Sequence, residues 1–223
     1  NARNCWVRRC ETIRTTRGHI WINFSRFITV AENKVHHSFD YGGGGKGYGI
    51  VAGNVATDCL ITDNILHHLR HALMTKRGSN GNVFSYNFSC ERRREPEGRP
   101  KLCDISIHGH YSYQNLFEGN VVEFVELADY WGPTGPFTTF LRNFVLTRIQ
   151  ISDHSHQSIF LGNHIAQGRI ETDGTSRNLV FGANRPPASE TLEDGMQVDT
   201  LPSSAYREDP PENWGDLPWP VLE

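Results

Sequence analysis

The chain has 223 residues and a net charge of −3; 21% of its residues are charged and 37% are hydrophobic. This length suffices for one domain with its own core. The slightly acidic balance argues against a nucleic-acid-binding surface, which needs a basic patch. No run of about 18 apolar residues occurs, so we expect no membrane-spanning helix. The chain begins at Asn1, without Met and inside a repeat, so we expect upstream sequence, with any targeting signal, to be missing.

A five-residue pattern that ends in Asn recurs along the chain. It has an apolar residue three positions before the last letter and a mostly polar or small residue directly before it. Successive copies are about 20–23 residues apart, except at two enlarged steps. In chain order the copies are WVRRC (6–10, with Cys in place of Asn), TVAEN (29–33), LITDN (60–64), VFSYN (83–87), LFEGN (116–120), TFLRN (139–143), IFLGN (159–163) and VFGAN (180–184).

Each copy predicts a short strand, an Asn corner and a second short strand. Asn suits such a corner because it tolerates the left-handed backbone region and can hydrogen-bond along a turn. A leucine-rich repeat needs an L-x-x-L-x-L signature that this chain lacks, and helical repeats are longer. A solenoid with three short strands per coil fits the period and stacks like residues on like. It predicts an internal column of Phe84, Phe117, Phe140, Phe160 and Phe181.

This repeat resembles the right-handed parallel β-helix of the pectate-lyase-like superfamily, in which Asn side chains stack at the turn between the second and third strands of each coil. ITVAENKVHH (28–37) is similar to the V-T-x-S-x-N-x-F-H-x-H rhythm of pectate lyases. The resemblance covers about residues 4–187 and implies an all-β solenoid domain of about eight coils over residues 1–187. One fold carries many activities, so the resemblance defines the fold more closely than the chemistry.

The C-terminal stretch LPSSAYREDPPENWGDLPWPVLE (201–223) resembles the tail of many bacterial secreted β-helix proteins. We therefore expect residues 188–223 to form an extended strap packed on the solenoid. The alternative is a flexible tail. The resemblance also implies a secreted or periplasmic protein.

The two enlarged steps contain inserts, FDYGGGGKGYG (39–49) and an Arg-rich segment (90–103). Both follow the strand after the Asn corner, and in the resembled family loops at this turn wall the substrate groove. The glycine-rich insert lacks the G-x-x-x-x-G-K-[ST] pattern, which favours a tight surface loop over a phosphate-binding loop. Cys90 and Cys103 bracket the second insert, so we expect a disulfide there if the protein is secreted.

The first strand of each coil is expected to form the floor of that groove. The alternation places Trp21, Asp104, His108, Glu126 and Arg148 on its outer side. The neighbouring loops contribute Lys46, Tyr48, Arg70, His71, Lys76 and Tyr111. In DYWGPTGP (129–136), Tyr130 and Trp131 fit sugar stacking and turn rigidity equally well.

The outer residues favour an enzyme that cleaves an acidic polysaccharide, best interpreted as a lyase. β-Elimination needs a base and a cation beside the substrate carboxylate, and His108, Lys76, Arg70 and His71 are the catalytic candidates. Asp104 and Glu126 are candidate ligands for Ca²⁺, which prefers carboxylate oxygens. The pectate lyase R-x-P-x-x-R-x-G motif is absent, which disfavours pectate as substrate. The expected substrate contacts are Trp21, Tyr48, Lys46, Tyr111, Tyr130, Trp131 and Arg148.

Two alternatives stay open for the function, and a separate one for two pairs of histidines. A β-helix glycoside hydrolase would need two carboxylates about 5–10 Å apart. A non-catalytic glycan-binding or structural β-helix would need the groove but no base. The doublets His36-His37 and His67-His68 recur at the same two repeat positions, where solvated or packing histidines are favoured over a metal site.

Overall fold

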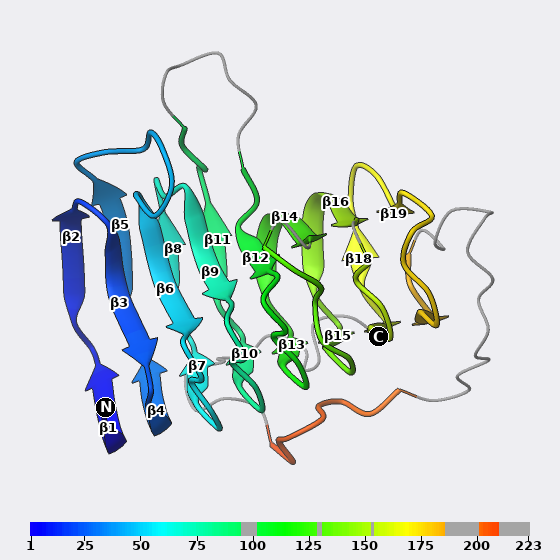
Figure 1. Ribbon diagram of the computed structural model, residues 1–223, viewed down its shortest axis with the longest axis horizontal. Helices are drawn as coiled ribbons and strands as arrows, with labels where there is room; N and C mark the ends of the chain where they lie inside the picture. Colours follow the sequence, from blue (N-terminus) through cyan, green and yellow to red (C-terminus); the bar gives the residue numbers. More distant parts are fainter. Residues whose placement is uncertain (95–101, 129–130, 153, 186–200, 210–223) are drawn as a thin grey trace.

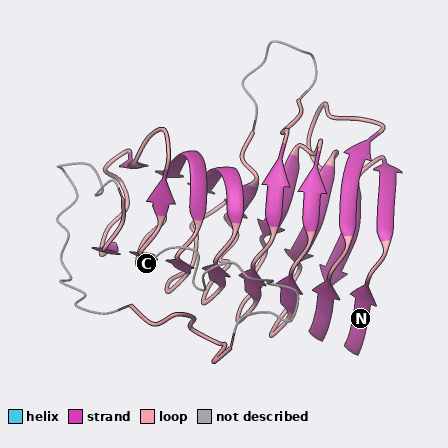
Figure 2. Cartoon of the chain, turned by 180° about the vertical axis from the view of Figure 1, so that it is seen from behind, coloured by secondary structure: helices cyan, strands magenta, loops and turns pink. Residues whose placement is uncertain are grey.

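The computed structural model describes residues 1–94, 102–128, 131–152, 154–185 and 201–209. These residues form a parallel β-solenoid of about seven turns (Figure 1). The predicted all-β, single-stranded parallel β-helix is therefore confirmed, with about one coil fewer than expected. All regular structure of the described residues is strand (Figure 2), so none of it is a helix that could cross a membrane.

Three strands per coil generate three faces. The first face, toward the viewer in Figure 1, contains β3 (Gly18–Asn23), β6 (Tyr48–Gly53), β9 (His71–Thr75), β12 (Ile105–His108) and β19 (Ile170–Thr172). The second face contains β1 (Arg3–Arg8), β4 (Arg26–Ala31), β7 (Leu60–Thr62), β10 (Val83–Ser85), β13 (Leu116–Glu118), β15 (Thr139–Leu141), β17 (Ile159–Leu161) and β20 (Val180–Gly182). The third face contains β2 (Glu11–Thr15), β5 (Lys34–Ser38), β8 (Ile65–His67), β11 (Phe88–Cys90) and β18 (His164–Ile165). β14 (Val121–Ala128) and β16 (Phe144–Ile151) each run continuously from the third face into the first.

An Asn ladder joins the coils at the corner between the second and third faces. In each step the Asn side-chain oxygen accepts from the backbone N–H and the amide of the Asn one coil earlier, as from Asn87 to Asn120 at 3.1 and 3.0 Å. The left-handed residue is the one before each Asn, such as Tyr86 with φ 53°. The expected role of Asn is therefore partly wrong, because Asn stabilises the corner through its side chain and its neighbour makes the turn. The ladder contains Asn33, Asn64, Asn87, Asn120, Asn143, Asn163 and Asn184.

The predicted Phe column lies inside the solenoid. Phe84, Phe117, Phe140, Phe160 and Phe181 are buried and stacked, with ring centres 4.8–5.4 Å apart. This spacing follows from the separation of neighbouring strands, about 4.8 Å. The prediction of an apolar interior is thus confirmed at the level of individual residues.

Part of the C-terminal tail lies against the second face. The Ala205 backbone N–H donates to Glu118 at 2.7 Å, and the hydroxyl groups of Tyr206 and Ser85 are 2.5 Å apart. Arg142 donates to the backbone carbonyl of Pro202 at 2.9 Å. Residues 201–209 therefore form a strap, while the predictions for 186–200 and 210–223 lie outside the described residues.

Candidate functional site

The inserts place their described residues at one edge of the first face. The segment 39–47 connects β5 to β6, and the segment 91–104 connects β11 to β12, so both precede a first-face strand. Figure 1 shows 39–47 and the described ends of 91–104 along the same edge of the solenoid. Segment 39–47 is tied down at Asp40, which pairs with Lys46 at 2.5 Å, and at Gly43, whose carbonyl accepts from Arg70.

A row of aromatic rings crosses the first face, and we call Trp21, Tyr48, His71, His108 and Trp131 the aromatic row. Successive ring centres are 6.3 Å apart from Trp21 to Tyr48, 5.1 Å from Tyr48 to His71, and 6.3 Å from His71 to His108. Trp131 continues the row by donating its indole N–H to His108 Nε2 at 3.0 Å. Tyr48 and His71 are register partners on adjacent strands, and Trp21 and His108 lie diagonally from them, so the coils bring together residues from positions 21 to 131.

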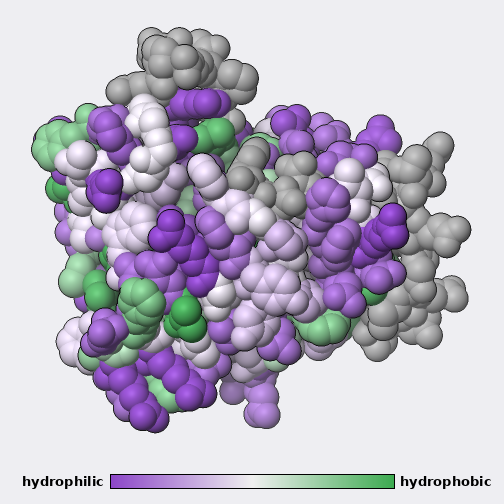
Figure 3. Space-filling model, viewed as in Figure 1, coloured by the Kyte–Doolittle hydropathy of each residue, from purple (hydrophilic) through white to green (hydrophobic). Residues whose placement is uncertain are grey.

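Two cations lie against this row. Lys76 Nζ is 4.9 Å from the Trp21 ring centre and 6.0 Å from that of Tyr48. Arg70 Cζ is 5.7 Å from the Tyr48 ring centre. Among the described residues, the Lys76 ammonium has no carboxylate or hydrogen-bonding partner, and burial lowers its pKa. Figure 3 shows hydrophilic residues gathered over the middle of this face.

Tyr48 and His71 are buried under the cations, each only 4% exposed. His71 Nδ1 donates to the Cys103 carbonyl at 2.9 Å, and burial lowers the pKa of His71 to about 3. The structure thus places both side chains beneath the surface, with Lys76 and Arg70 over the Tyr48 ring. Their roles toward a substrate stay a prediction.

His108 is half-buried and neutral at ordinary pH. Burial and then the charge of Lys76 lower the pKa of His108 to about 4. The indole N–H of Trp131 reaches its Nε2, so that nitrogen holds the lone pair and Nδ1 holds the proton in the neutral ring. Trp131 itself is 62% exposed.

Asp104 is a structural residue, which corrects its assignment as a calcium ligand. It is 1% exposed; one of its oxygens accepts from Ser89 at 2.7 Å and the other from the backbone N–H groups of Glu123 and Phe124 at 3.0 and 2.9 Å. Arg92 lies 3.4 Å from the same carboxylate. Burial raises the pKa of Asp104 to about 7, while Ser89 and Arg92 act to lower it. Both carboxylate oxygens are thus occupied within the protein, because they satisfy the irregular backbone of β14.

Glu126 and Cys103 also differ from expectation. Cys103 is a fully buried free thiol that donates to Glu126 at 3.7 Å, and Cys90 is a free thiol as well. The expected Cys90–Cys103 disulfide is therefore absent. Burial and the charge of Glu126 raise the pKa of Cys103, so the sulfur stays protonated. With Asp104 occupied elsewhere, the predicted calcium site retains only the Glu126 carboxylate.

The remaining predicted contacts are scattered. Lys46 is held by Asp40 in its own loop. Tyr111 lines a separate open pocket that also contains Pro133, His154 and His156. Arg148 is exposed, with its guanidinium 4.7 Å from the Phe124 ring centre. Tyr130 lies outside the described residues.

Sequence reasoning missed two apolar members of the site. Val51 and Met74 pack with Tyr48 and Trp21 outside the main core. They share one register column with Trp21 and face outward, so the same alternation that identified Trp21 would have identified them. Their packing fixes the Trp21 side chain beside Lys76.

No family model, curated protein or solved structure matches this chain. Membership in the pectate-lyase-like superfamily therefore stays a prediction. The function has to be inferred from the first face itself.

Proposed function

We propose that the first face binds an acidic polysaccharide and cleaves it by β-elimination. The observation that carries this proposal is the Lys76 side-chain nitrogen, half-buried against Trp21 with no anionic partner among the described residues. Burying a charge without a counter-ion is unfavourable, which favours the neutral amine that can accept a proton. Trp21 and Trp131 provide aromatic faces on which a sugar ring can pack.

The pKa shifts of Lys76 and His108 support one of them as the base. A base works best when its pKa lies near the working pH. Burial lowers the pKa of Lys76, which favours its neutral, proton-accepting form, whereas the pKa of His108 is lowered to about 4, which makes that ring a weak base. We therefore assign the base to Lys76, with the Arg70 guanidinium beside the substrate carboxylate and His108 as a neutral polar contact.

In this reaction Lys76 Nζ takes the proton from C5 of the uronate. The C–H electrons form the C4–C5 double bond, the C4–O bond breaks, and the leaving oxygen takes a proton from water. A secreted or periplasmic location would bring the enzyme to such a polymer.

A glycoside hydrolase is less well supported by the carboxylates. Asp104 is occupied, and Glu126 and Glu171 lie two strands apart in one register column. Two strand spacings of about 4.8 Å put their backbones about 10 Å apart, at or beyond the separation of about 6.5–9.5 Å in inverting enzymes. Binding without cleavage needs only the aromatic faces, and it differs from catalysis in yielding no product.

The experiment incubates the protein with a panel of uronate-containing polysaccharides and follows the ultraviolet absorbance of the unsaturated product. We expect Lys76→Met to lower turnover by about 100-fold or more at an unchanged melting temperature. Lys34→Met is the matched control, because Lys34 lies on the third face beside Glu11. If the protein retains the polymer but forms no product, it is a binding protein and not a lyase. If it shows no retention and no product, the proposal is refuted.

A further inference from the structure

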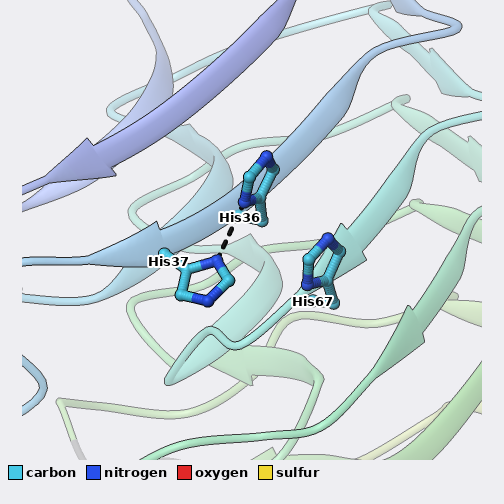
Figure 4. Close-up of side chains that lie close together, drawn as sticks. All are labelled: His36, His37 and His67. Carbon is cyan, nitrogen blue, oxygen red and sulfur yellow. Dashed lines mark hydrogen bonds between the residues drawn. The ribbon is translucent and has the colours of Figure 1, made fainter.

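Four histidines on the third face form two stacked pairs, which we call the His ladder (His36, His37, His67 and His68). His36 on β5 and His67 on β8 are register partners with ring centres 4.6 Å apart. The rings of His37 and His68 are stacked in the same way at 4.3 Å. Figure 4 shows His36, His37 and His67 gathered together. The ladder lies away from the aromatic row, so its role is independent of the proposed function.

The backbone explains why consecutive histidines meet. In a straight strand, neighbouring side chains point to opposite faces. His37 and His68 have φ values of 54° and 53°, which turn the chain at this corner. The turn brings the Nδ1 atoms of His36 and His37 to 2.8 Å, and those of His67 and His68 to the same distance. The same pairing of two histidine Nδ1 atoms thus occurs in two adjacent coils.

Three of these residues have nitrogens that converge. One ring nitrogen each of His36, His37 and His67 lies within 4.8 Å of the others. Glu11 accepts from His36 Nε2 at 2.8 Å, which leaves His36 Nδ1 as the nitrogen with the lone pair. A carboxylate behind the distal nitrogen is the usual support of a metal-binding histidine. Burial and the neighbouring imidazoles lower the pKa of His37 and of His67.

We propose that His36, His37 and His67 bind a divalent transition metal, with Glu11 orienting His36. The spacing indicates which metals fit. Metal–nitrogen bonds are about 2.0–2.1 Å, so two nitrogens at a right angle are about 2.9 Å apart and two at a tetrahedral angle about 3.3 Å. The 2.8 Å separation of the His36 and His37 nitrogens is nearest the right angle, which favours the tetragonal arrangement of Cu²⁺ or Ni²⁺ over the tetrahedral one of Zn²⁺. The His67 nitrogen, within 4.8 Å of the other two, has to move closer on binding.

The competing explanation is that each Nδ1 pair shares one proton in an ordinary hydrogen bond. Metal binding would then have to displace that proton from His37 Nδ1. The two explanations predict different behaviour toward added metal, because a purely hydrogen-bonded ladder gains nothing from it.

The first experiment uses the untagged, chelator-treated chain. CuCl₂, NiCl₂ and CoCl₂ are titrated separately by calorimetry, and Cu²⁺ broadening of histidine ring protons is followed by NMR. We expect one site per chain that broadens the signals of His36, His37 and His67 first, a raised melting temperature, and a weak Co²⁺ visible spectrum. No binding, or broadening confined to other histidines, would overturn the site, and an intense tetrahedral Co²⁺ spectrum would overturn the tetragonal assignment.

Variants then test the ligands. His37→Gln and His67→Gln should each weaken Cu²⁺ binding by at least about 10-fold, and Glu11→Gln by about 10-fold through the supporting contact. His164→Gln, on β18 of the same face, is the matched control and should bind as the wild type does. Unchanged affinity in His37→Gln and His67→Gln would place the metal elsewhere and refute the proposal.

Discussion

The Asn corner and the first face are built from the same coils but obey different rules. At the corner, each coil from Asn33 to Asn184 contributes the same side chain to the same hydrogen bond. On the first face, one outward column runs Trp21, Val51, Met74, Ser106 and Glu126, with no residue repeated. Stacking constrains residue identity at the corner, whereas the solenoid leaves the outward positions of the first face free to differ from coil to coil.

The largest expected effect is the difference in stability loss between a substitution inside the solenoid and one on its surface. Replacing Phe117 by Ala should lower the free energy of unfolding by about 3–5 kcal/mol, because the ring is fully buried between Phe84 and Phe140. Denaturant unfolding measures the difference. Phe88→Ala, at a position 44% exposed on the third face, should cost less than about 1 kcal/mol. Equal losses at both positions would contradict the stacked interior.

The second largest effect is expected at Asp104, beside the irregular backbone of β14. Asp104→Ala should cost about 3 kcal/mol, because it leaves the buried N–H groups of Glu123 and Phe124 without an acceptor. Asp104→Asn is the control, since its amide oxygen can still accept from both N–H groups and its NH₂ can donate to Ser89. Equal loss in the two variants would mean that the charge, held near Arg92, stabilises this site rather than the hydrogen bonds.

The positions that repeat from coil to coil could be predicted from the sequence. The positions where the coil is irregular could not. The Asn and Phe columns could be found from spacing, because each position is set by its equivalents in adjacent coils. Asp104 has no equivalent residue in the adjacent coils. Its burial depends on the register shift between Val122 and Phe124, which no local sequence pattern indicates. Tyr48 and His71 were placed on the correct face but at the wrong depth, because segment 39–47 and the neighbouring cations cover them.

The smallest effect concerns the buried His71 side chain and how it makes the stability of the protein depend on pH. The pKa of His71 is about 3 when folded and about 6.5 when unfolded. The unfolded chain therefore binds the extra proton as the pH falls through 6.5, and stability is lost at about 1.4 kcal/mol per pH unit. Asp104, whose pKa is raised to about 7, acts in the opposite direction over this range, so the wild-type curve alone is ambiguous.

Comparison with His71→Asn removes that ambiguity, because Asp104 is common to both proteins. The Asn side chain can still donate to the Cys103 carbonyl but does not titrate. The stability advantage of the wild type over His71→Asn should shrink by about 1.6 kcal/mol between pH 6.5 and pH 5. Denaturant unfolding at a series of pH values measures this advantage. A constant difference would mean that His71 accepts a proton in the folded protein as readily as in the unfolded chain, and the aromatic row would then be open to water at its centre.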